Sequence, residues 1–218
     1  LELHVSSYLM AFLRGDQDAM RGELDWATGR SGEENWLLSA QSDTEAYFVR
    51  LGSARELSQR AVASARRADS EEPAALWQAN AALREAEFGN AMAARQNAMT
   101  ALSLVPGKDV TTMAALALAR AGDVAQAQRL VNGLDRGFPQ NTIVQVYWLP
   151  AIRAAIELAS KNSAKALELL KTAAPYELGQ SQPFFVGMMY PAYLRGQAYL
   201  HARNGKEAAA EFQRIISR

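Results

Sequence analysis

The chain has 218 residues, of which 49% are apolar, so it is long enough to build a sizeable core. Its 23 basic and 23 acidic side chains cancel, which argues against a nucleic-acid surface or a polybasic membrane patch, because both need a basic excess. It contains no cysteine, which excludes disulfides, thiolate nucleophiles and cysteine-ligated metals, and no run of about 18 apolar residues that could insert into a bilayer.

Because the chain begins with Leu1 rather than Met and has no basic-then-apolar leader, we expect it to be part of a longer protein. We expect a soluble domain, which could be cytoplasmic or the extracytoplasmic part of a membrane-anchored protein.

Apolar residues at helical spacing, abundant alanine and sparse glycine predict helices along the whole chain, and strand signals are nearly absent. The expected helices lie near residues 1–14, 16–28, 33–50, 53–69, 72–88, 90–104, 109–121, 123–136, 141–160, 163–173, 184–203 and 205–217. Read in order they form six antiparallel pairs. The pairs in residues 1–71 follow a common pattern less closely than those in residues 72–218, and we expect one continuous domain in which residues 1–71 are divergent hairpins.

Alanine recurs early in the second helix of each pair, at Ala54, Ala94, Ala127, Ala166 and Ala208, and Met20 takes the same place in the first pair. The intervals from Met20 onward are 34, 40, 33, 39 and 42 residues. Alanine at this position lets two helix backbones approach closely. Glycine before it supplies a left-handed residue that ends the first helix, as at Gly15, Gly89 and Gly122, with Gly52 and Gly205 slightly later. The residues expected to cap the second helices are Asp16, Ser53, Asn90, Asp123 and Ser163.

Two stretches carry this pattern most fully: Gly196-x-x-Tyr199…Ala208-x-x-x-Phe212 and Ala115-x-x-Leu118…Gly122…Ala127-x-x-x-Val131…Pro139. Both resemble the signature of the tetratricopeptide repeat (TPR), a helix pair of about 34 residues. The resemblance implies an all-α, right-handed superhelical α-solenoid of about six pairs, with a concave face made by the first helix of each pair. The segment Pro175–Pro183 is expected to be an exposed loop, and the apolar run Pro183–Tyr190 is expected to be buried.

Nothing in the sequence indicates catalysis, a cofactor or a metal. His4 and His201, the only histidines, fall at opposite ends of the expected solenoid, too far apart to share a proton or a metal. Phosphate-binding and nucleophile-elbow motifs are missing. Arg60, Arg66 and Arg67 form a basic spot on one helix, which is typical of a solvated face. We therefore expect a protein that is not an enzyme.

If the family's habit of binding on the concave face applies, the repeat frame predicts which residues line the groove. The candidates are Leu83, Glu87, Thr112, Leu116, Arg120, Trp148, Tyr190, Tyr193, Gln197 and His201. The lysine–asparagine–arginine clamp by which some TPR proteins hold a peptide's terminal carboxylate is absent at the matching positions. The aromatic members suit a binding hot spot, and the competing interpretation is that Trp148 and the tyrosines pack between helix pairs.

The run Tyr147–Gly179, with Met189–Leu200 after it, is similar to the C-terminal TPR regions of bacterial serine/threonine protein kinases. Comparable regions follow winged-helix regulators. Kinase motifs themselves are absent from this chain. The first hypothesis for function is therefore a non-catalytic scaffold for a protein or peptide ligand. The alternative is a regulatory or sensor region of a larger kinase or winged-helix regulator, and self-association through the ends of the solenoid is compatible with both.

Overall fold

A computed structural model of the chain describes residues 1–179 and 189–217, and every regular element in these ranges is a helix. The elements are α1 (Glu2–Arg14), α2 (Gln17–Ala27), α3 (Glu34–Tyr47), α4 (Leu51–Arg67), α5 (Glu71–Glu87), α6 (Ala91–Leu104), α7 (Lys108–Arg120), α8 (Val124–Gly137), the π-helix η1 (Ile143–Trp148), α9 (Leu149–Ala159), α10 (Ser163–Leu170), the 3₁₀ turn η2 (Ala174–Tyr176), α11 (Tyr190–His201) and α12 (Gly205–Ile216).

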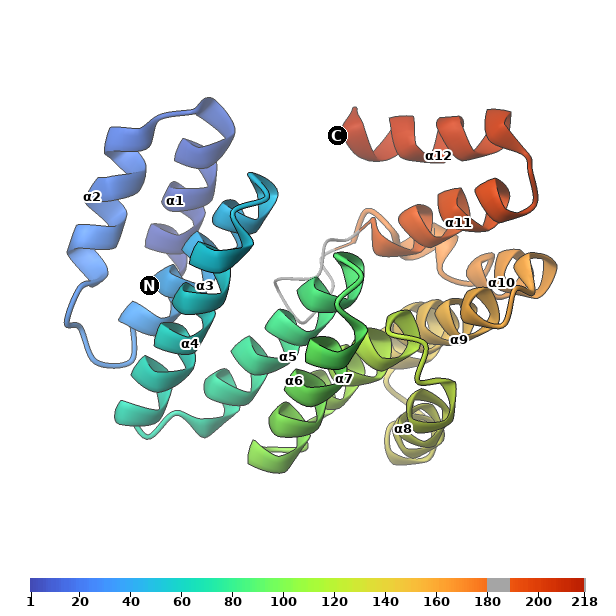
Figure 1. Cartoon of the computed structure of the whole chain (residues 1–218), viewed down its shortest axis with the longest axis horizontal. Helices are drawn as coiled ribbons and strands as arrows, with labels where there is room; N and C mark the ends of the chain where they lie inside the picture. Colours follow the sequence, from blue (N-terminus) through green and yellow to red (C-terminus); the bar gives the residue numbers. More distant parts are fainter. Residues whose placement is uncertain (180–188, 218) are drawn as a thin grey trace.

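Consecutive helices pair, and each pair packs on the next in chain order, so the chain is an all-α solenoid (Figure 1). The colours of Figure 1 run along the array from α1 to α12, and the array curves so that α12 lies at the top of the view, level with the upper ends of α1 and α2. This confirms the expected fold class. Helix packing continues across residue 71, because α4 packs on α5 and Trp36 lies edge-on against Trp77.

Alanine explains how closely the helices approach. Ala94, Ala98 and Ala101 on α6, and Ala127 on α8, have no exposed surface, and they face buried residues of α5 and α7. One apolar cluster runs from α5 to α11 and includes the large side chains of Trp148 and Leu116. Each pair buries its apolar stripe against neighbours, as stacked repeats require.

Glycine has a related packing role in the last pair. A Cβ atom added to Gly196 on α11 would lie 2.7 Å from Cζ and 2.9 Å from Cδ1 of the Phe212 ring on α12. The Gly196 and Phe212 positions of the repeat pattern therefore depend on each other, because the ring occupies the space that any other residue at 196 would need.

The turns within pairs agree with the sequence at Gly15, Gly89 and Gly122, which adopt positive φ. The expectation was wrong for Gly52 and Gly205, which lie inside the first turns of α4 and α12. There the left-handed residues are Val49 and Arg203. The first turn of a helix has negative φ, so a glycine in that turn does not mark the left-handed residue that precedes the helix.

The cap predictions hold for Asp16 and Asp123, whose side chains accept from the backbone N–H of Ala19 at 3.0 Å and of Gln126 at 3.2 Å. Asn162, rather than the expected Ser163, caps α10 by accepting from Lys165. Asn90 occupies an N-cap position but donates to Glu85 instead, and Ser53 lies within α4.

Two expected elements differ in detail. The helix expected at residues 141–160 begins as the π-helix η1, and α9 follows with Pro150 in its first turn. Proline cannot donate to the carbonyl four residues earlier, and a π-helical turn accommodates that loss. Of the expected loop Pro175–Pro183, Pro175 lies in η2, and residues 180–183 are outside the described ranges, as are residues 184–188 of the next expected helix.

Candidate functional site

Three of the predicted groove residues meet around the carboxylate of a fourth, Glu87 at the end of α5. Arg120 of α7 donates to it through Nε at 2.7 Å and through Nη2 at 3.1 Å. The hydroxyls of Tyr190 and Tyr193 on α11 donate to the same carboxylate, that of Tyr193 at 3.0 Å. We call Glu87, Arg120, Tyr190 and Tyr193 the Glu87 cluster. It joins three first helices that are far apart in the sequence.

Burial and pairing set the charges of the Glu87 cluster. Burial alone would raise the pKa of Glu87, but the guanidinium of Arg120 and the two tyrosine hydroxyls outweigh it and lower that pKa below its usual value. Burial likewise opposes the charge of Arg120, yet its bonds to Glu87 raise its pKa. Burial and then the negative charge of Glu87 raise the pKa of Tyr193 to about 12. The cluster therefore holds one carboxylate, one guanidinium and two neutral hydroxyls at neutral pH.

The other predicted groove residues divide into two groups. Leu83, Thr112, Leu116 and Trp148 are at most 6% exposed, so they belong to the core and form no open wall of a groove. Gln197 is half-buried and His201 is exposed. Both lie on α11 at helical spacing from Tyr190 and Tyr193, so they continue the same face beyond the cluster.

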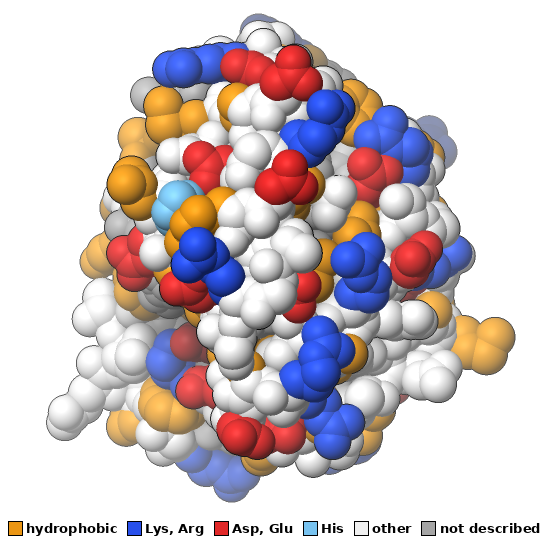
Figure 2. Space-filling view, turned by 90° about the vertical axis from the view of Figure 1, so that its left-hand side faces the viewer, with side chains coloured by type: hydrophobic (Ala, Val, Ile, Leu, Met, Phe, Trp, Pro, Cys, Tyr) orange, Lys and Arg blue, Asp and Glu red, His pale blue; other side chains and the backbone are white. Residues whose placement is uncertain are grey.

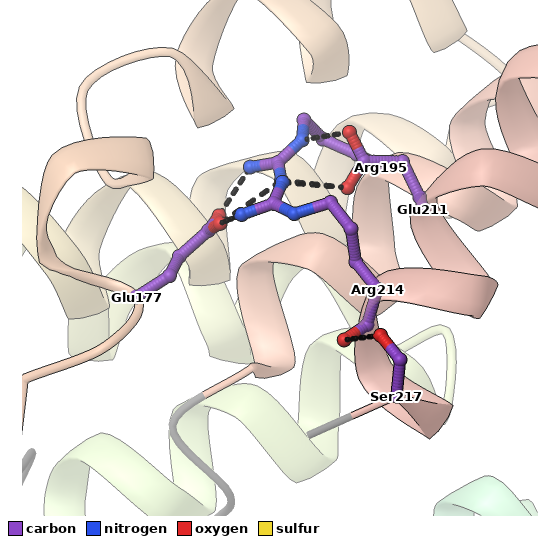
Figure 3. Close-up of polar contacts among 5 residues, drawn as sticks. All are labelled: Glu177, Arg195, Glu211, Arg214 and Ser217. Atoms are coloured by element: carbon purple, nitrogen blue, oxygen red, sulfur yellow. Dashed lines mark hydrogen bonds and ion pairs between the residues drawn. The ribbon is translucent and has the colours of Figure 1, made fainter.

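A second polar cluster holds the last helix pair together (Figure 3). Its residues were not predicted from the sequence. Arg195 of α11 donates to Glu211 of α12 through Nε at 2.9 Å and Nη2 at 2.8 Å, and both its terminal nitrogens also reach Glu177, which follows η2. Arg214 donates to Glu177 at 3.0 Å and to Glu211 at 3.2 Å. Glu177 has no exposed surface. Two guanidiniums and two carboxylates balance in charge, which fits a structural tie between elements.

A third polar cluster joins α3 to α5. Arg84 donates to Asp43 at 2.9 Å and to Ser58, and Asn80 donates to Asp43 at 3.0 Å. Burial raises the pKa of Asp43 despite the opposing charge of Arg84. The sequence alone does not distinguish Asp43, Asn80 and Arg84 from polar residues on the surface, because they do not recur at the repeat interval.

A small pocket of about 190 Å³ opens between α4, α5 and α6. Its lining residues are Arg55, Ser58, Gln59, Gln78, Ala81, Glu85, Ala93 and Asn97, and all but the two alanines have polar or charged side chains. Arg55 and Glu85 are already joined by two hydrogen bonds, at 2.6 and 2.8 Å. The pocket is smaller than the clefts of about 300 Å³ or more that hold small ligands.

Within residues 1–179 and 189–217, no group of three His, Asp or Glu side chains could hold a metal ion. No helix in these ranges is long and apolar enough to cross a bilayer. The face at the α1–α2 end carries Lys and Arg interspersed with Asp and Glu rather than a patch of one sign (Figure 2).

The stacking of helix pairs defines the chain as an α-solenoid. The sequence matches no protein-family profile and no curated protein. Among solved structures it is similar to a tetratricopeptide repeat protein from Parabacteroides merdae, with 16% sequence identity over 99% of this chain and 92% of that chain and a TM-score of 0.45.

Proposed function

We propose that this chain is a non-catalytic scaffold that binds a protein or peptide on the face formed by its first helices. The observation that supports this proposal is the Glu87 cluster, in which side chains of α5, α7 and α11 converge on one face of the solenoid. Solenoids of this kind present extended curved surfaces, and such surfaces suit elongated ligands.

The open part of the proposed surface is the continuation of the cluster along α11. Gln197 offers an amide that both donates and accepts, and His201 offers an exposed ring. Glu87 and Arg120 are 22% and 16% exposed in their side chains and satisfy each other, so we assign them to shaping the surface rather than to capturing a charge.

Site-specific photo-crosslinking tests this assignment. A photoreactive residue at Gln197 or His201 should capture a ligand protein from the native host's extract, whereas one at the exposed Asn132 on the second helix α8 should not. Equal capture from Asn132 and from the α11 positions would reject the proposed face.

The resemblance to C-terminal regions of bacterial serine/threonine kinases stays a prediction. We propose it as the setting in which such a scaffold would serve a neighbouring effector domain. The ligand would then be a part of the same protein, and capture would occur within one molecule.

A further inference from the structure

Among residues 1–179 and 189–217, no helix covers one side of α1, whose side chains are exposed. The opposite side packs inward, where Tyr8 and Ala11 are buried and the Tyr8 hydroxyl lies 2.8 Å from the Thr44 hydroxyl of α3. The open side carries Leu3, Met10 and Leu13, which are 76%, 52% and 81% exposed. With Ser6 and the exposed Leu9 between them, these positions share one face of the helix, because residues three, four and seven apart align.

Exposed apolar side chains also lie at the turn between α3 and α4, which the half-buried Phe12 of α1 contacts. Phe12 packs edge-on against Tyr47 at 5.3 Å and against Phe48 at 5.9 Å between ring centroids. Tyr47 and Val49 are themselves 72% and 68% exposed. We call Leu3, Leu9, Met10, Leu13 and the turn Tyr47–Val49 the α1 patch. Contiguous exposed apolar surface of this kind usually marks a contact with another molecule.

The ends of α1 carry opposite charges. Glu2 lies in its first turn and Arg14 in its last, both are exposed, and neither forms an ion pair within the described ranges. Two copies of α1 laid antiparallel would bring each Glu2 to the other copy's Arg14. The same register pairs Leu3 with Leu13 and Ser6 with Met10, because each pair of numbers is symmetric about residue 8. The helix is thus complementary to itself in charge, and the same register places Leu3 of each copy beside Leu13 of the other.

We propose that the α1 patch is the interface of a two-fold symmetric homodimer in which α1 packs antiparallel on the partner's α1. An isologous contact needs a surface that matches itself, and a two-fold dimer is the commonest assembly of this type. The inner pairs of the solenoid already stack helix on helix, so the dimer extends that mode of packing beyond α1.

The charges around the patch favour a second copy over a lipid surface. An amphipathic helix that lies on anionic lipid carries Lys and Arg beside its apolar face. Residues 1–27 carry five acidic side chains, Glu2, Asp16, Asp18, Glu23 and Asp25, and two basic ones, Arg14 and Arg21. That acidic excess repels an anionic membrane, whereas α1 itself carries one acidic and one basic side chain, Glu2 and Arg14, so its formal charges do not oppose a second α1.

Sedimentation velocity over a concentration series tests the dimer. The mass should rise from the 23.8 kDa of one chain toward twice that value. Leu13→Lys places two charges in the interface and should leave a folded monomer, checked by an unchanged helical circular dichroism spectrum. Met92→Lys on α6 is the matched control, since Met92 is 82% exposed and lies outside the patch, and it should still dimerise. A wild-type monomer at every concentration, or a dimer that survives Leu13→Lys, overturns the proposal.

Charge swapping tests the antiparallel register. Glu2→Arg and Arg14→Glu should each weaken dimerisation about fivefold or more, because the symmetry doubles every mismatch. The double variant Glu2→Arg/Arg14→Glu should recover it. Mixing the two single variants should form heterodimers, in which both end pairs are again of opposite sign. Failure of the double variant and of the mixture to recover would overturn the antiparallel pairing. These outcomes are independent of the ligand-binding surface on α11.

Discussion

Residues 1–71 and residues 72–217 form the same kind of helix pairs with different packing. In the second region one apolar cluster extends from α5 to α11, and half of its buried members are alanines such as Ala98 and Ala115. In the first region there are two smaller clusters, and Trp36 packs against both of them. Specific polar and aromatic contacts accompany them, including the Tyr8–Thr44 hydrogen bond and the stacking of His4 on Trp26, with 3.5 Å between ring centroids.

The comparison shows why a repeat can be easy to recognise in one part of an array and hard in another. Close packing of two helices requires a small residue at the contact, so a regular array of such contacts produces small residues at a regular interval in the sequence. Where a larger side chain takes the place of alanine, as Met20 does in the cluster of α1, α2 and α3, the alanine periodicity is interrupted. Mutations should therefore act differently in the two regions.

Core truncation should have the largest effect and should be worse in the second region. Leu116→Ala in the continuous cluster should cost about 3–5 kcal/mol of unfolding free energy, and Leu57→Ala in the smaller α4–α5 cluster about 2–3 kcal/mol. Urea unfolding followed by circular dichroism measures both. Equal costs would mean that the two regions do not differ in how tightly they are packed.

Gly196→Ala should destabilise the second region by about 1–3 kcal/mol, because its Cβ would overlap the Phe212 ring. The control is Gly133→Ala in α8, where an added Cβ meets no atom within 4 Å and should stabilise the helix by about 0.5–1 kcal/mol. Adding Phe212→Ala to Gly196→Ala should remove the clash, so the two costs should fall short of additive. Strict additivity in this thermal-unfolding cycle would contradict the contact.

Thr44→Val tests the specific contacts of the first region. It keeps the shape of the side chain but takes the partner from the buried Tyr8 hydroxyl, and we expect a loss of about 1–2 kcal/mol. The double variant Tyr8→Phe/Thr44→Val removes both polar groups and should cost less than Thr44→Val alone. A larger cost for the double variant would show that packing, not the hydrogen bond, holds these helices together.

The smallest effect is expected from high pH acting on the second region. Since the folded-state pKa of Tyr193 is about 12, above its ordinary value of 10.0, the folded chain holds this proton longer than the unfolded chain. Stability should therefore be intact below pH 10 and fall as the pH rises from 10 to about 12. Tyr193→Phe should fall less steeply over this interval, whereas Tyr47→Phe, at an exposed site, should match the wild type. Parallel slopes for all three proteins would contradict the pKa assignment.

The sequence predicted the helix pairs because their signals are local: alanine spacing, glycine turns and caps such as Asp16. It also selected the four members of the Glu87 cluster by their place in the repeat, although it predicted a groove lining rather than their mutual contact. The pairing of Arg195 with Glu177 was not predicted, because it depends on the tertiary position of the segment that carries Glu177 relative to α11. Likewise, only the packing shows that Trp148 faces the core.

In a solenoid whose helix pairs contact only their neighbours, unfolding begins at the ends, because a terminal pair has one neighbouring pair instead of two. The tyrosine hydroxyls of α11 bond a carboxylate that lies 103 and 106 positions earlier in the chain. Unfolding of the final hairpin, α11–α12, must therefore break contacts with α5 as well as with the preceding hairpin. Local unfolding of the last hairpin is therefore coupled to the third hairpin, and the two should open together rather than one hairpin at a time.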